Sequence, residues 1–212
     1  SNAVLKGNTF NKVNIGVHHS FSNSLNVSNS LFKNSLNGIT VEGAYNPVIE
    51  GNVFDGVKFG TTLVAPEEAL VSGNEYKRIG QEDLFEIDYC LRKFSGVPLT
   101  TIRIPSRNAH ALPLKSYGIH SDGMGSFTYK DNLFTGFSSS VSIRDTSTAR
   151  GSTLPTIPAT YGIVINNSGH TPGYVFRNEF SKTDIGLQTE RNNTELTVKC
   201  NEFASNLASH PV

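Results

Sequence analysis

The chain has 212 residues, of which 37% are hydrophobic and 17% charged, and its 18 basic and 18 acidic side chains leave no net formal charge. This balance argues against a surface built for nucleic acid, and no run of ~18 apolar residues is present that could insert into a membrane. Asn, Ser, Thr and Gly are abundant and Trp is absent, which is more typical of secreted β proteins than of cytosolic helical ones.

The sequence opens with Ser1-Asn2-Ala3, which is typical of an expression-tag remnant, so residues 4–212 are interpreted as one domain. Two cysteines, Cys90 and Cys200, are too few for a disulfide framework. They also lack the spacing of metal ligands, so no metal site is expected from them.

A unit of about 22 residues recurs along the chain, marked by a large apolar residue with Gly six positions later. Six of nine units carry this Gly, and six of nine carry Asn two positions before the marker. Successive markers are separated by 22, 22, 22, 36, 22, 22, 24 and 23 residues. In chain order they are Phe10, Phe32, Phe54, Tyr76, Leu112, Phe134, Thr156, Phe180 and Phe203.

Each unit contains two short β-branched segments, such as Val27 before the Asn position and Ile163 after the Gly, with no helical stretch between them. Strand-only units of this length predict a solenoid, because a propeller blade would need roughly twice as many residues. Stacking would place Asn over Asn and Phe over Phe. The amides could then hydrogen-bond from rung to rung while the rings fill the interior.

The repeat resembles the right-handed parallel β-helix of the pectate-lyase-like superfamily, whose rungs carry an Asn-x-Phe or Asn-x-Ile step and a Gly-Ile-x-Val step. The resemblance covers residues 4–207 and implies an all-β, right-handed parallel β-helix solenoid of about nine rungs. That superfamily includes lyases, hydrolases, epimerases, tailspikes and adhesins, so the resemblance indicates fold rather than one activity. Neither end shows an obvious cap, and we expect an excerpt of a longer bacterial protein with further domains.

Two segments depart from the repeat. Fourteen residues too many lie between Tyr76 and Leu112, which predicts one long insertion within about residues 83–107, with the apolar alternation of a hairpin or flap. Residues 145–160 keep the interval but form a Ser/Thr/Pro-rich loop where a strand is expected. Because insertions on a solenoid often lie on its binding side, we expect a site between these two segments.

Side chains alternate along a strand, so the second and fourth residues after each Gly are expected to face solvent. On the middle rungs these positions form a polar patch between the two departures. We expect the substrate-contacting residues there to be Tyr117, Glu86, Ser142 and Asn166, and the chemically active ones to be His120, Asp122 and Arg144.

The stretch "YGIHSDG", residues 117–123, is similar to the Tyr-Gly-x-Asp-x-His step of alginate epimerases and related lyases, with Asp and His exchanged. Elimination or epimerisation of a uronate needs a base for the C5 proton and a cation that neutralises the carboxylate. If the protein is a lyase or an epimerase, His120 is the base and Arg144 is the cation. Asp122 orients His120 or, with Glu86, holds Ca²⁺. Tyr117 would protonate the leaving oxygen, although its parity with Ile119 predicts that it points inward.

Four observations favour a function without catalysis. An Asp122–Arg144 contact would be explained by an ordinary surface ion pair, and His18 occupies the same column as His120 without a comparable patch. The Tyr-Gly-Ile step recurs at residues 161–163, which indicates a structural role. Signatures of polygalacturonases, pectate lyases, Ser/His/Asp hydrolases, P-loops and zinc sites are missing.

We therefore expect a secreted or cell-surface bacterial β-helix that acts as a rigid scaffold or a polysaccharide-binding surface. Its expected partner is a polysaccharide or surface glycan, with no nucleic acid and no membrane insertion. No metal or cofactor is expected, apart from the Ca²⁺ of the alternative. That alternative is a polysaccharide lyase or C5-epimerase acting through His120, Asp122 and Arg144.

Overall fold

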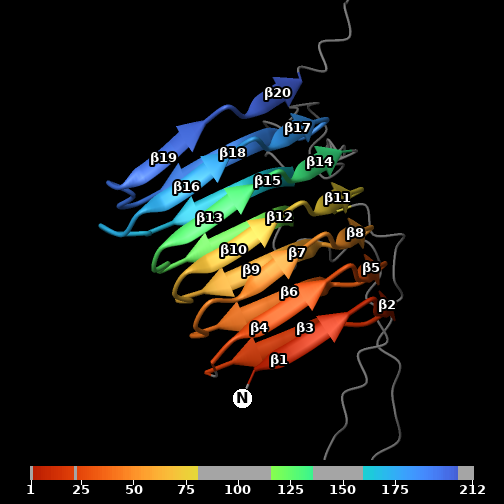
Figure 1. Ribbon diagram of the computed structural model, residues 1–212. Helices are drawn as coiled ribbons and strands as arrows, with labels where there is room; N and C mark the ends of the chain where they lie inside the picture. The colour runs from red at the N-terminus through yellow and green to blue at the C-terminus, as the bar shows by residue number, and fades with distance from the viewer. Residues whose placement is uncertain (1, 22, 81–115, 136–159, 205–212) are drawn as a thin grey trace, which may run out of the picture.

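The computed structural model describes residues 2–21, 23–80, 116–135 and 160–204 (Figure 1). All regular structure in these four ranges consists of strands, which form three sheets in which every pairing is parallel. The part of the chain described contains no helix that is long and apolar enough to cross a membrane. Consecutive strands enter sheets A, B and C in turn, and such connections between parallel strands are right-handed. The fold is a right-handed parallel β-helix, which confirms the predicted class.

The strands are short and follow one another in the same order in every rung. Sheet A comprises β1 (Ala3–Lys6), β4 (Leu25–Ser28), β7 (Val48–Glu50), β10 (Ala69–Ser72), β13 (Phe127–Lys130), β16 (Gly173–Phe176) and β19 (Leu196–Lys199). Sheet B comprises β2 (Thr9–Asn11), β5 (Leu31–Lys33), β8 (Val53–Asp55), β11 (Glu75–Lys77), β14 (Leu133–Thr135), β17 (Glu179–Ser181) and β20 (Glu202–Ala204). Sheet C comprises β3 (Ile15–Ser20), β6 (Asn37–Glu42), β9 (Phe59–Val64), β12 (Ser116–Asp122), β15 (Thr160–Asn166) and β18 (Ile185–Glu190).

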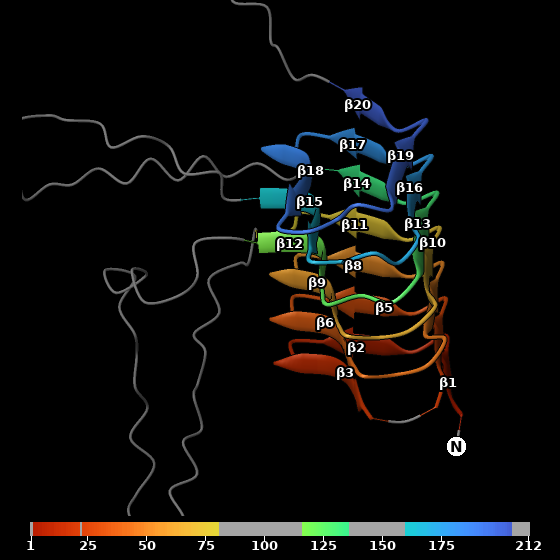
Figure 2. The ribbon, with the colours of Figure 1, turned by 90° about the vertical axis from the view of Figure 1, so that its left-hand side faces the viewer.

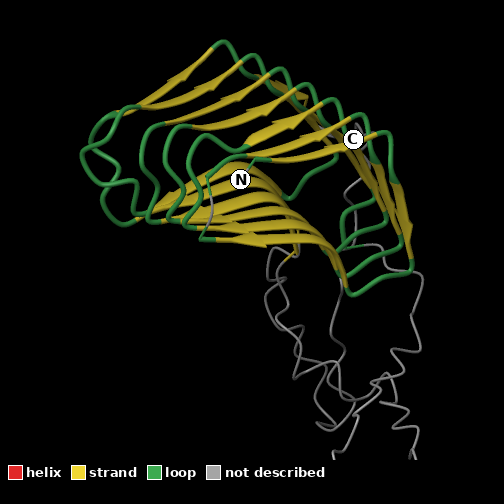
Figure 3. Cartoon of the chain, turned by 60° about the horizontal axis from the view of Figure 1, so that its bottom comes forward, coloured by secondary structure: helices red, strands yellow, loops and turns green. Residues whose placement is uncertain are grey.

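The rungs stack along one axis, from β1 and β3 at one end to β19 and β20 at the other (Figure 2). A view tilted toward that axis separates the sheets into faces of the solenoid, joined by short loops (Figure 3). Seven rungs at ~4.8 Å make a rod of roughly 30 Å.

The number of rungs differs from the expected nine. The ring of Tyr76 stacks directly on Phe134, and Phe134 stacks on Phe180, each pair with centroids 4.8 Å apart. The described part of the chain therefore has no rung between those of Tyr76 and Phe134, or between those of Phe134 and Phe180. The reason is that 38 residues separate β11 from β12 and 24 separate β14 from β15, whereas three separate β2 from β3, so each long connection adds an apparent repeat to one rung.

Residues 81–115 of the first long connection and 136–159, the whole of the second, lie outside the described residues. The predicted insertion at 83–107 falls within the first. The predicted loop at 145–160 falls within the second except for Thr160, which begins β15. The shapes predicted for the insertion and the loop therefore stay predictions.

A continuous stack of seven aromatic rings runs through the interior behind sheet B. Neighbouring ring centroids are 4.7–4.9 Å apart and their planes differ by 3–9°. This separation equals the strand spacing, because each ring is carried by one strand of sheet B. At Gly38 an added Cβ would lie 2.6 Å from the Phe54 ring and 2.6 Å from the Gly60 carbonyl oxygen. The recurrent Gly is thus required because no side chain fits beneath the ring of the next rung.

A column of asparagines joins the rungs between sheets A and B. The main-chain N–H and the Nδ2 of Asn74 both donate to Oδ1 of Asn132, at 3.1 Å each, and Nδ2 also donates to the Ile49 carbonyl oxygen at 2.9 Å. Asn132 repeats this arrangement with Asn178 and the Val71 carbonyl oxygen. Ser30 occupies one place in the column, where its Oγ accepts from the Asn8 N–H at 3.1 Å. The amides in the middle of the column are buried and fully hydrogen-bonded.

Replacing Asn132 with Ala removes an acceptor for two buried donors of Asn74 and a donor to Val71. Because buried groups left without partners cost about 1–3 kcal/mol each, we expect N132A to lower the free energy of unfolding by roughly 3 kcal/mol or more in urea titrations. The matched control is N192A, at an exposed corner position. Equal losses in the two variants would show that the asparagine column contributes little to stability.

The interior also carries two tyrosine hydroxyls. That of Tyr76 is 2.9 Å from Thr61 Oγ1, whereas that of Tyr129 is near Ser121 but hydrogen-bonds to no described residue. Burial raises the pKa of both hydroxyls far above the ordinary value. The pKa of each hydroxyl is higher in the folded state than in the unfolded state, so below about pH 10 both states are protonated and the full free energy of unfolding is kept. Above that pH the unfolded tyrosines ionise, and the free energy of unfolding falls.

We therefore expect the free energy of unfolding to fall steeply above about pH 10, and to fall less steeply in Y129F. At neutral pH this substitution should not destabilise the protein, because the hydroxyl that it removes is buried without a partner. Urea titrations between about pH 8 and 11 measure both effects. An identical pH dependence in Y129F and the wild type would contradict the assignment to Tyr129.

Candidate functional site

The predicted patch maps to the outer face of sheet C, along the left-hand side in Figure 2. Strand β12 pairs directly with β9 on one side and β15 on the other. Three outward rows therefore cross these strands in register. They are Phe59, Tyr117 and Tyr161; Thr62, His120 and Val164; and Val64, Asp122 and Asn166.

Tyr117 lies beside His120 on this face, with ring centroids 5.0 Å apart, so the expectation that it points inward is wrong. The strand bends at Gly118, and this bend shifts the alternation by one residue. A Cβ added to Gly118 would meet the core ring of Phe134 at 2.5 Å, and the next residue, Ile119, is also fully buried. Two consecutive residues thus face the interior, and the residue before the Gly faces outward.

The same bend aligns three aromatic side chains along the solenoid axis. The Tyr117 ring lies 5.6 Å from Phe59 and 5.6 Å from Tyr161, centroid to centroid. Phe59 and Tyr117 are partly buried and Tyr161 is 4% exposed. Phe59 and Tyr161 were not predicted as site residues, although an aromatic–Gly pair on three consecutive strands of sheet C was a signal that could have found them.

The electrostatics keep Tyr117 in its neutral form. Burial, followed by the nearby Tyr161 and Glu190 side chains, raises the pKa of the Tyr117 hydroxyl above its ordinary value. The phenol is therefore a hydrogen-bond donor at neutral pH and a poor base.

Asp122 and Asn166 lie next to each other on neighbouring strands, and Glu190 follows Asn166 in the same row. Oδ1 of Asn166 is buried and accepts no hydrogen bond from the residues described. Gln188 Nε2 donates to Glu190 Oε1 at 2.6 Å. This row therefore offers one acceptor whose hydrogen-bonding capacity is not used.

The remaining predicted residues, Glu86, Ser142 and Arg144, lie outside the described residues. The register of sheet C leaves no strand for them beside β12, because the neighbours of Asp122 are Val64 and Asn166. In the described ranges, no three His, Cys, Asp or Glu side chains are grouped as a metal site would require. The catalytic roles of His120, Asp122 and Arg144 stay a prediction.

The geometry defines a parallel β-helix with an aromatic and polar outer face on sheet C. Residues 1–85 match the model of a family described as the periplasmic copper-binding protein NosD. This range contains the strands from β1 to β11. Comparisons with curated proteins and with solved structures each gave no match.

Proposed function

We propose that this β-helix is a non-catalytic module that binds a saccharide chain on the outer face of sheet C. The observation that carries the proposal is the pair of half-buried rings Phe59 and Tyr117 on neighbouring rungs, which the buried ring of Tyr161 continues along the solenoid axis. Small-molecule sites combine apolar and aromatic surface with a few placed polar groups, and sugar rings present both an apolar C–H face and hydroxyls. Here His120 and Asn166 supply polar groups beside the row.

The scaffold role follows from the interior. The aromatic stack and the asparagine column run through successive rungs without a break, so outward side chains on neighbouring rungs are held one strand spacing apart. A linear polymer with a regular repeat meets the same chemical groups at regular intervals on such a surface. Preorganisation of this kind raises affinity because little ordering is needed on binding.

The residues on the outer face of sheet C can be explained without a catalytic role. The raised pKa of Tyr117 disfavours it as a base, and the strand neighbours of Asp122 provide no cation for a uronate carboxylate. One observation favours the alternative of a polysaccharide lyase or epimerase. His120 and Tyr117 lie side by side, as the base and the proton donor of an elimination would.

The printed description of the NosD family supports a location in the cell envelope or outside the cell. Attachment to the cell surface is the finer proposal. Copper binding is not proposed for the matched range, because its described donors do not fit that metal. Copper prefers thiolate, thioether or imidazole ligands, yet the range has no Cys or Met. Its two imidazoles, His18 and His19, are consecutive on β3 and so point to opposite faces of sheet C.

The test is a titration with alginate, pectate, chondroitin and neutral glycans, with and without Ca²⁺. Melting temperature and the ultraviolet absorbance of an unsaturated product are followed together. We expect a saccharide to raise the melting temperature without new absorbance, and Y117A to weaken binding by at least about tenfold, or ~1.4 kcal/mol. The matched control is N37A, in the same outward row on β6, which should bind like the wild type.

New absorbance that disappears in H120A would show catalysis and establish the lyase alternative. Saccharide binding that is equal in the wild type and in Y117A would remove the aromatic row from the site. If no saccharide in the panel changes either signal, the binding proposal fails and the scaffold role alone is left.

A further inference from the structure

The outer face of sheet A carries a second surface that the sequence did not predict. A groove of about 600 Å³ crosses β10, β13 and β16 there. The side chains that form its walls come from three consecutive rungs. Those used below are Glu68, Leu70, Thr128, Lys130, Tyr174 and Phe176.

Two features of the sequence, Gly173 and the corner before β16, shape this groove. A Cβ at Gly173 would lie 2.4 Å from the ring of Phe127, so the absence of a side chain there leaves room for this buried core ring beneath β16. The corner before β16 has six residues, 167–172, whereas the corner before β13 has four, 123–126. The longer corner brings Pro172 to the groove wall.

Tyr174 provides the apolar platform. It is 43% exposed, although it stands in the middle of a strand whose neighbours Gly173 and Val175 are buried. In register, Thr128 on β13 and Thr197 on β19 lie on either side of it. An exposed aromatic ring between two threonines presents a flat apolar surface with hydroxyls at both edges. This combination suits a sugar ring, which has an apolar face and hydroxyls around it.

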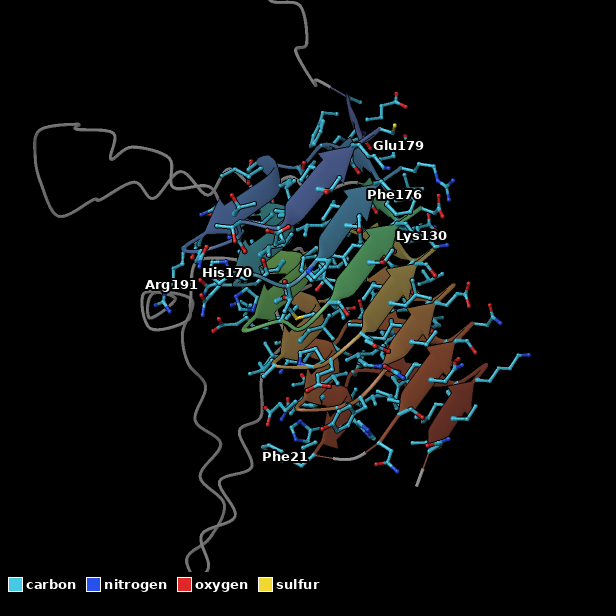
Figure 4. All side chains as sticks on the ribbon, turned by 60° about the vertical axis from the view of Figure 1, so that its left-hand side comes forward. Phe21, Lys130, His170, Phe176, Glu179 and Arg191 are labelled. Atoms are coloured by element: carbon cyan, nitrogen blue, oxygen red, sulfur yellow. The ribbon has the colours of Figure 1, made fainter. Side chains whose placement is uncertain are left out.

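Cations define one edge of the groove. Lys130 and Lys199 lie on either side of Phe176 in the next outward row, and Figure 4 shows Lys130 and Phe176 on adjacent strands. Nζ of Lys199 is 6.0 Å from the centre of the Phe176 ring. Neither lysine forms an ion pair with a described residue. Their strands are two apart, so the backbones that carry them are separated by roughly 9.6 Å.

Of the other charges nearby, one pair is closed, Glu68 lies at the opposite edge, and Glu50 stands in the lysine row on β7, where its Oε1 accepts from Ser72 Oγ at 3.4 Å. Arg177 makes two hydrogen bonds to Asp131, Nε–Oδ1 at 2.7 Å and Nη2–Oδ2 at 2.8 Å, and is thereby neutralised. Glu68 lines the groove at the start of the strands, whereas the lysines stand at their ends. An anionic ligand is therefore favoured with its charge toward Lys130 and Lys199 and away from Glu68.

We infer that this groove binds an acidic saccharide, with a sugar ring on Tyr174 and a carboxylate or sulfate held by Lys130 and Lys199. Nucleic acid is a poorer fit, because its binding depends on many phosphate contacts, and among the described residues at this edge of the groove only Lys130 and Lys199 are cations without an ion pair. An acidic peptide would satisfy the lysines but has no flat ring to cover Tyr174. The inference is independent of the sheet C proposal, because the two faces belong to different sheets.

The experiment is isothermal titration of the full chain with oligogalacturonate, oligomannuronate and chondroitin oligosaccharides. The matched ligand is methyl-esterified oligogalacturonate, which keeps the sugar rings and removes the charge. We expect an acidic oligosaccharide to bind, the ester to bind at least about tenfold more weakly, and affinity for the acid to fall as salt is raised.

Substitutions of the proposed contact residues test whether the ligand binds in the groove on sheet A. We expect Y174A and the double variant K130A/K199A each to lower the affinity for the acidic ligand by at least about tenfold, with unchanged melting temperatures because these side chains face outward. The matched control for charge is K6A, which stands in the same outward row of sheet A at its first strand. The control for aromatic loss is F21A, which removes an exposed ring at the corner after β3 on the first rung. Both controls should bind like the wild type.

Equal binding of acid and ester, or full affinity in both Y174A and K130A/K199A, would overturn the inference. Loss of binding in Y117A alone would also overturn it, while leaving the sheet C proposal intact. If none of the acidic oligosaccharides binds, the inference fails, and the neutral glycans of the earlier titration decide the sheet C proposal separately.

Discussion

The spacing of parallel strands, ~4.8 Å, is the constraint on which the rest of the structure depends. Three parallel sheets in register place every residue directly over its equivalent in the next rung, so an interior side chain must pack against a similar one. Flat rings can do this, as the stack from Phe10 to Phe203 shows. Asparagine can do it because its side chain is both donor and acceptor. Ser30 substitutes for Asn in one rung because its Oγ accepts from Asn8 and donates to the Ser28 carbonyl oxygen.

The same constraint explains why the fold could be predicted from the sequence and the rung count could not. Like-on-like stacking imposes a period, and the period alone predicts a solenoid. A period, however, records spacing and does not show where the chain leaves the solenoid and returns. The unit with Tyr76 and the unit with Gly118 belong to one rung, as do those with Phe134 and Gly162, and each pair is separated by a long connection. Counting every apparent unit therefore gave two rungs too many.

Side chains on the outer faces do not have to pack against an equivalent residue in the next rung. Their positions were therefore harder to predict from the repeat. His120 and Asp122 were placed on the correct face by simple alternation, but Tyr117 was not, because the bend at Gly118 turns two consecutive residues inward. The groove on sheet A was missed for a different reason. Its central row holds Leu70, Thr128, Tyr174 and Thr197, in which no residue type recurs on adjacent rungs, so the row leaves no periodic signal. The repeat identifies the interior residues, because they recur in every rung. The residues of a binding surface are found at outward positions that differ from rung to rung.

Variation is concentrated on the middle and later rungs, and this has a physical consequence. The first three corners that lead into sheet A have four or five residues, whereas the corner at 167–172 has six and is followed by the exposed Tyr174; the two long connections also precede β12 and β15 of these rungs. Because the interior stack and the asparagine column continue unchanged through these rungs, the added features are held on a scaffold that does not deform around them. Outward groups on adjacent strands thus keep a fixed separation, and a ligand with a matching repeat can contact several rungs without the protein losing conformational entropy.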